Sequence, residues 1–96
     1  MNFQINAAIQ LLPLGTNDNR WHVIDAAIAL IAESGLKHVV CPFETVVEGP
    51  SNKVYELIQA IQEKTIAGGC SELLINVKIH AANRNLGFEE KLENYR

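Results

Sequence analysis

The 96-residue sequence predicts an α+β domain with the element order strand, helix, strand, strand, helix, strand. Two segments, one near each end of the chain, alternate apolar and polar residues, which is typical of half-buried strands. Two longer segments repeat apolar residues at spacings of three and four, as amphipathic helices do, and a short extended pair lies between them. The 48% hydrophobic and 20% charged composition suits a chain that folds around one core, so we expect a single domain over residues 1–96.

The first strand and the first helix follow from the N-terminal pattern. Residues 3–11 are predicted as a strand, in which apolar positions alternate with the polar residues Asn2, Gln4, Asn6 and Gln10. The turn-forming residues 13–15 end this strand. A helix is predicted over about residues 19–34, capped by Asn17 or Asp18. Its apolar stripe, which we expect in the core, is Trp21, Ile24, Ile28 and Ile31.

The middle and the end of the chain repeat this order. Residues 36–41 and 45–48 are predicted as a hairpin around Pro42, and Gly49 and Pro50 end it. Ser51 is expected to cap a second helix that ends at residues 68–69, with the buried stripe Val54, Leu57, Ile58 and Ile61. The last strand alternates again and places Leu73, Ile75, Val77, Ile79 and Ala81 on one face.

Right-handed crossovers fold this order into a ferredoxin-like βαββαβ sandwich, a four-stranded antiparallel sheet with two helices on one face. The odd-numbered residues of the first and last strands then face the helices. The opposite face carries almost only neutral polar residues, with Lys78 as the charged exception, and both a solvent face and an oligomer interface are compatible with them. Residues 86–96 form a short C-terminal helix with Phe88, Leu92 and Tyr95 on one side. We expect this helix to dock on its own domain or on a neighbouring subunit, and the second is favoured because the apolar face of its own sheet is already covered.

Charge and composition exclude several classes of protein. A net charge of -3 lacks the basic footprint of a nucleic-acid binder. The apolar runs are far shorter than the roughly 20 residues that span a bilayer, so we expect a cytoplasmic protein with no membrane partner. Cys41 and Cys70 indicate reduced thiols, and the three histidines show no metal-ligand spacing. A thiol enzyme that uses Cys41 is kept as a weaker hypothesis.

The predicted hairpin is the chemically richest segment. It brings together an aromatic, a hydroxyl and two carboxylates, and Glu44 and Glu48 would point to one face of an extended strand with Val46 between them. Two solvated strand charges would also explain these residues, and the hairpin alone favours that interpretation. Both interpretations stand at this point.

The sequence resembles a family of small thiamine-binding proteins related to YkoF. The resemblance covers nearly the whole chain and rests on residues 13–15, 34–36, 42, 45–49, 77–79 and 88–92 in this order. It implies a cytosolic protein that binds thiamine or its hydroxymethylpyrimidine moiety without turnover, as a homodimer or homotetramer, with no cofactor besides the bound ligand.

Candidate ligand-binding residues follow from the chemistry of thiamine. Its thiazolium cation would be offset by Glu44 or Glu48 and faced by Phe43. Its aminopyrimidine would hydrogen-bond to side chains of the first strand and the hairpin, namely Asn6, Thr16 and Thr45. The alternative is a regulatory βαββαβ interaction module that binds another small effector, or a protein, at a subunit interface.

Overall fold

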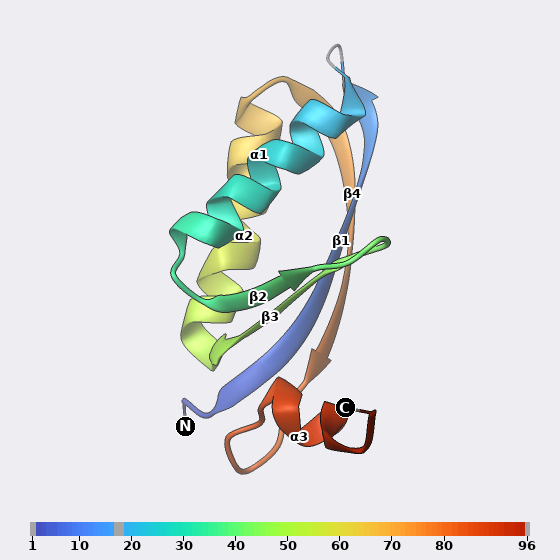
Figure 1. The fold of residues 1–96 in the computed structure, drawn as a ribbon. Helices are drawn as coiled ribbons and strands as arrows, with labels where there is room; N and C mark the ends of the chain where they lie inside the picture. Colours follow the sequence, from blue (N-terminus) through green and yellow to red (C-terminus); the bar gives the residue numbers. More distant parts are fainter. Residues whose placement is uncertain (1, 17–18, 96) are drawn as a thin grey trace.

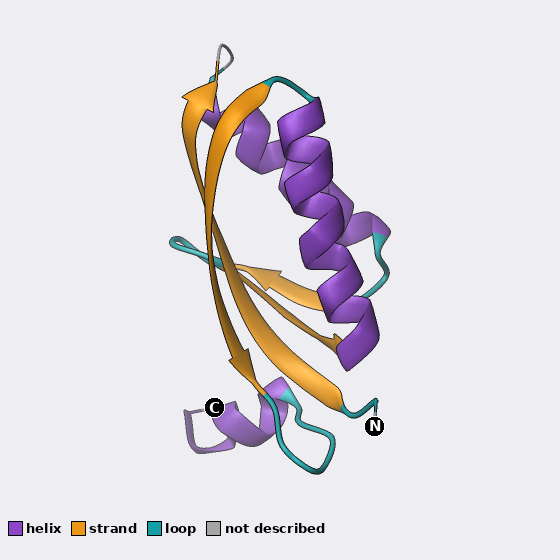
Figure 2. Cartoon of the chain, turned by 180° about the vertical axis from the view of Figure 1, so that it is seen from behind, coloured by secondary structure: helices purple, strands orange, loops and turns teal. Residues whose placement is uncertain are grey.

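Four strands form one antiparallel sheet in the computed structural model, which describes residues 2–16 and 19–95 and all their side chains except that of Thr16. The sheet order is β2-β3-β1-β4. The strands are β1 (Gln4–Thr16), β2 (Lys37–Val40), β3 (Thr45–Pro50) and β4 (Cys70–His80). Helices α1 (Arg20–Glu33) and α2 (Ser51–Ala67) cover one face of the sheet (Figures 1 and 2). The predicted βαββαβ sandwich is therefore confirmed.

The core lies between the sheet and the two helices. The buried residues of the cluster are Ile5, Ala7, Ile9, Ala27, Ile31, Val47, Val54, Leu57 and Ile61. The expected stripe of α2 is confirmed, but that of α1 is shifted, because the buried line runs through Ala27 rather than Ile28. A small residue at this point lets α1 approach the sheet closely. Trp21 is consequently turned outward and is 63% exposed, so its assignment to the core was wrong.

Strand β1 is longer than predicted. It pairs with β3 only from Gln4 to Ile9, yet it continues beside β4 as far as Thr16, with irregularities around Gly15. Pro13 does not end the strand, because β1 has become an edge on that side and a proline at an edge interrupts no ladder. The far ends of β1 and β4 therefore form a two-stranded ribbon beyond β2 and β3.

Helix starts and the last strand also differ from expectation. The side chain of Asn19 caps α1 by accepting a hydrogen bond from the Trp21 N–H at 2.8 Å, whereas the expected caps, Asn17 and Asp18, lie outside the described residues. Ser51 is the first residue of α2 rather than its cap. In β4, Val77 and Ile79 remain exposed despite their expected burial, because β4 is an edge strand with a neighbour on one side only.

The C-terminal tail packs on its own sheet, which was the less favoured of the two predicted docking sites. It forms α3 (Phe88–Leu92) and a 3₁₀ turn, η1 (Glu93–Tyr95), beside the face that α1 and α2 leave open (Figure 2). Leu86 is completely buried there and Phe88 almost so. The polar face of the sheet is thus partly covered, and the remaining space between it and α3 forms a pocket.

Candidate functional site

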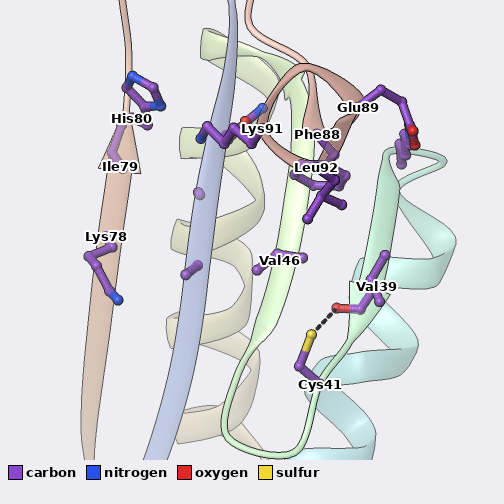
Figure 3. Close-up of a pocket in the computed structure, with 14 residues that line it drawn as sticks. Val39, Cys41, Val46, Lys78, Ile79, His80, Phe88, Glu89, Lys91 and Leu92 are labelled. Atoms are coloured by element: carbon purple, nitrogen blue, oxygen red, sulfur yellow. Dashed lines mark hydrogen bonds and ion pairs between the residues drawn. The ribbon is translucent and has the colours of Figure 1, made fainter. Parts of the chain in front are cut away.

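A pocket of about 500 Å³ lies on the open face of the sheet beside α3 (Figure 3). All four strands contribute to its lining, together with Cys41 of the β2–β3 turn and several residues of α3. Because these elements are far apart in sequence, the pocket exists only once the sheet and the tail have assembled.

The strand register places two rows of side chains across this face of the sheet, and all of them except Glu48 line the pocket. One row is polar and consists of His80, Asn6, Glu48 and Lys37; the other consists of Lys78, Ala8, Val46 and Val39. Neighbouring strands lie about 4.8 Å apart, so each row is a continuous strip of side chains. Ala8 is an apolar exception to the polar alternation of β1. Its small side chain leaves room above the sheet.

The tail forms the wall, and hydrogen bonds of backbone and side-chain groups hold it against β1. Gln4 contributes three of these bonds: its N–H donates to Asn85 Oδ1 at 2.7 Å, its Nε2 donates to the Leu86 carbonyl at 2.7 Å, and its carbonyl accepts from the Leu86 N–H at 3.0 Å. Phe88 and Leu92 then present apolar side chains to the pocket (Figure 3).

Glu48 fixes the start of α3. Its Oε1 accepts a hydrogen bond from the Phe88 N–H at 2.5 Å, at a helix start where Gly87 has no side chain to cap with. A carboxylate is favourable at this position, because the first N–H groups of a helix lack intrahelical partners. Lys37 Nζ lies 3.7 Å from both Glu48 Oε2 and Glu89 Oε1, and 5.5 Å from the centre of the Phe88 ring.

Asn6 is the buried polar group of the pocket. The residue is only 5% exposed, and its Nδ2 donates a 3.4 Å hydrogen bond to the Leu86 carbonyl. Its Oδ1 is buried and has no hydrogen-bond partner in the described chain. An unpaired buried acceptor costs about 1–3 kcal/mol of stability. Asn6 therefore offers an unused acceptor at the pocket.

Charged side chains surround the apolar floor of the pocket, which is formed by Ala8, Val46 and Val39. Lysines 37, 78 and 91 and Glu89 line the pocket, and His80 joins them from the end of β4 (Figure 3). Glu90 is engaged outside the lining by Arg84, with N–O distances of 2.8 and 2.9 Å. The hydrogen bond from the Arg84 guanidinium holds the pKa of Glu90 below its ordinary value.

The structure distributes the predicted ligand-binding residues over several places. Asn6 lines the pocket, and Glu48 lies beside it on the same face of the sheet, bound to α3. Thr45 is buried on the opposite face, because it pairs with the core residue Ile9. Of the predicted ligand-binding residues whose side chains are described, Asn6 alone lines this pocket.

The two remaining hairpin residues lie in the turn between β2 and β3. Phe43 is 84% exposed there, and the Glu44 carbonyl accepts a 2.9 Å hydrogen bond from the Cys41 N–H. Glu44 precedes β3 and so does not share a strand face with Glu48 as expected. Thr16 pairs with Cys70 at the far end of β1, and its side chain lies outside the described residues.

Most of the residues that line the pocket were not predicted, although two features of the sequence indicated some of them. Ala8 breaks the polar side of the first strand, and Phe88 and Leu92 repeat at a helical spacing in the tail. The lysines gave no comparable signal, because isolated exposed lysines are common on any surface.

The described residues give little support to a thiol enzyme or to a metal site. Cys41 lines the pocket, and its thiol donates a long 3.8 Å hydrogen bond to the Val39 carbonyl, while Cys70 is a buried free thiol. No three described His, Cys, Asp or Glu residues gather as a metal site would require. No described helix has the length and hydropathy needed to cross a membrane.

Comparison with known proteins connects this fold to one family. The family model of thiamine-binding proteins matches residues 7–96. A UPF0045 protein of Clostridium perfringens is 31% identical over 91 residues, which cover 95% of this chain and 96% of that protein.

Solved structures of other proteins have the same fold as this chain. A domain of unknown function from Bacillus cereus, DUF77, superposes with a TM-score of 0.92 at 25% identity, covering 100% of this chain and 93% of that one. A candidate thiamine biosynthesis/salvage protein of Thermotoga maritima gives a TM-score of 0.85 at 26% identity, over 97% of this chain and 99% of that one. Since the family model spans nearly the whole sequence, the chain belongs to the thiamine-binding protein family.

Proposed function

We propose that this protein binds thiamine, or its hydroxymethylpyrimidine moiety, in the pocket beside α3 and releases it unchanged. The observation that carries the proposal is the unpaired, buried Oδ1 of Asn6 at an apolar pocket of a thiamine-binding family member. Ligand pockets typically measure about 300–1,000 Å³ and combine apolar walls with a few placed polar groups, and this pocket does the same.

Each part of the ligand has a matching surface. The amino group of the pyrimidine would donate to Asn6 Oδ1, and the flat ring would lie on Ala8 and Val46 against Phe88. Because Oδ1 is shut off from bulk water, the donor reaches it after the Asn6 amide rotates or the tail shifts slightly. Glu48 and Glu89 lie at the side of the pocket where they would offset the thiazolium charge.

We also propose that the protein works as a homodimer or homotetramer. The sheet face that α3 leaves uncovered carries exposed apolar side chains on the far ribbon, namely Leu12, Leu14 and Leu74. Leu12 and Leu74 are cross-strand neighbours. In a two-fold symmetric dimer, these leucines of one copy would pack against the same leucines of the other copy. This ribbon lies at the other end of the open face from α3, so the pocket would stay accessible.

The test is a calorimetric titration of the purified protein with thiamine and with each half of the molecule. Recognition through Asn6 predicts that hydroxymethylpyrimidine binds on its own and that the hydroxyethylthiazole half does not. Chromatography of the ligand after long incubation should recover it unchanged. Absence of both heat and a thermal shift with thiamine and with the pyrimidine would rule the proposal out. Binding of an unrelated effector in their place would favour a regulatory module.

A further inference from the structure

The pocket is cationic although the protein is acidic. Its described lining holds three lysines and one carboxylate, Glu89, whereas the whole chain has a net charge of -3. Lys37 is already paired with Glu48 and Glu89. Lys78 and Lys91 form no ion pair among the described residues, although the charge of Lys91 acts on Glu90, which Arg84 binds. Two ammonium groups without an ion-pair partner in that part of the chain therefore border the apolar floor.

These two lysines come from different elements and line the same pocket. Lys78 pairs with Ala8 in the sheet, which makes it the diagonal cross-strand neighbour of Asn6, and such neighbours lie roughly 7–8 Å apart. Lys91 belongs to α3, three residues after Phe88, and its side chain lies over β1 (Figure 3). Both long side chains can reach one group bound above Ala8. Glu90, the neighbour of Lys91, is occupied by Arg84.

The unpaired Asn6 Oδ1 is an independent feature of the same pocket, and it calls for a donor. A ligand that satisfies all three groups carries an N–H donor on a flat ring and an anionic group a short distance away. From this arrangement, and resting on the proposed function, we infer that the preferred ligand is a phosphate monoester of the aminopyrimidine type. Its phosphate is bound between Lys78 and Lys91, and its ring lies beside Asn6.

The experiment compares thiamine, thiamine monophosphate and inorganic phosphate by calorimetry on the wild-type protein. Charge-assisted hydrogen bonds to a phosphate predict that the monophosphate binds at least about tenfold more tightly than thiamine. The preference should shrink as the salt concentration rises. Inorganic phosphate should bind much more weakly than the ester, because it lacks the ring.

Matched variants test whether Lys78 and Lys91 cause the preference for the monophosphate over thiamine. In the double variant Lys78→Gln and Lys91→Gln, the two affinities should become nearly equal while thiamine itself still binds. Lys64→Gln removes the same charge from α2, on the other face of the sheet, and should leave the preference unchanged. Since all three lysines are exposed, folding is not at risk, and circular dichroism checks it.

The outcomes separate the two proposals. Equal binding of thiamine and its monophosphate, or a preference that survives in the double variant, would overturn the phosphate inference and leave thiamine binding intact. Binding of the monophosphate alone would support the inference and replace free thiamine as the ligand. If neither compound binds, both proposals fail.

Discussion

Asn6 occupies a position where a polar side chain weakens the fold. Its Oδ1 is buried without a partner, and its single hydrogen bond, to the Leu86 carbonyl, is long at 3.4 Å. That carbonyl already accepts a 2.7 Å bond from Gln4, so it does not depend on Asn6. A residue that costs stability and lines a pocket is typical of a binding site, where function is maintained at the expense of folding.

Asn6→Leu should therefore separate stability from binding. Leucine has a similar branched shape and leaves no buried acceptor, so the free energy of unfolding should stay level or rise by about 1 kcal/mol. Binding of thiamine or its monophosphate should be lost. Denaturant titration and calorimetry measure the two effects. Gln10→Leu, two rows along the same face and outside the lining, is the control and should keep binding. A destabilised Asn6→Leu protein that still binds the ligand would contradict the assignment.

Single side chains were harder to predict than the strands that carry them. Alternation correctly placed Ile5, Ala7 and Ile9 toward the helices, because burial fixes the register of a central strand. The same rule places Thr45 in the core and Val46 at the pocket, but only once the pairing of β3 with β1 is known. The hairpin composition suggested one site, but the structure divides these residues between the two faces of the sheet and a turn.

The sequence predicted the position of the tail less well than that of any other element. Its amphipathic spacing predicted a helix, and the helix exists, yet α3 has five residues and cannot be stable alone. Its docking depends on long-range contacts with Gln4 and Glu48, which periodicity does not encode. A helix that places Phe88 and Leu92 beside a polar sheet face also contradicts the usual expectation that such faces stay in water. The pocket is created by this one unexpected contact.

Glu48→Gln should loosen α3. The substitution keeps the shape but removes the charge that accepts from the Phe88 N–H and pairs with Lys37. Hydrogen bonds to charged groups contribute about 1.5–3 kcal/mol, so hydrogen exchange at the Phe88 amide should accelerate by roughly ten- to a hundredfold. Exchange in α2 should not change.

The matched control is Glu56→Gln, since Glu56 is an exposed carboxylate of α2 whose described ion pair is to Lys53. Mass spectrometry of the C-terminal peptide measures exchange in both variants. Unaltered protection in Glu48→Gln, or equal acceleration in the control, would show that the carboxylate does not anchor the tail.

The whole molecule exposes more surface than its size requires. Its accessible surface is 6270 Å², against about 5,500 Å² expected from the scaling of monomeric proteins with mass. Its radius of gyration is 13.9 Å, against about 12.5 Å for a compact domain of this length. The excess belongs to the long ribbon of β1 and β4, which extends beyond the rest of the sheet (Figure 1). A small core and an extended apolar ribbon together favour self-association.

Leu74→Lys should dissociate the proposed oligomer. Leu74 is 47% exposed on the ribbon and faces its cross-strand neighbour Leu12, so each copy would place a lysine opposite the same lysine or bury it among leucines. Light scattering should then report the 10.6 kDa monomer, whereas we expect twice or four times that mass for the wild-type protein. Ile66→Lys makes the same change at a similarly exposed position, 48%, on α2 and should leave the mass unchanged. A monomeric wild-type protein would contradict the proposed self-association. An oligomer that survives Leu74→Lys would show that the subunit interface lies elsewhere on the surface. Because the ribbon and the pocket occupy opposite ends of the open face, the dissociated variant should still bind its ligand.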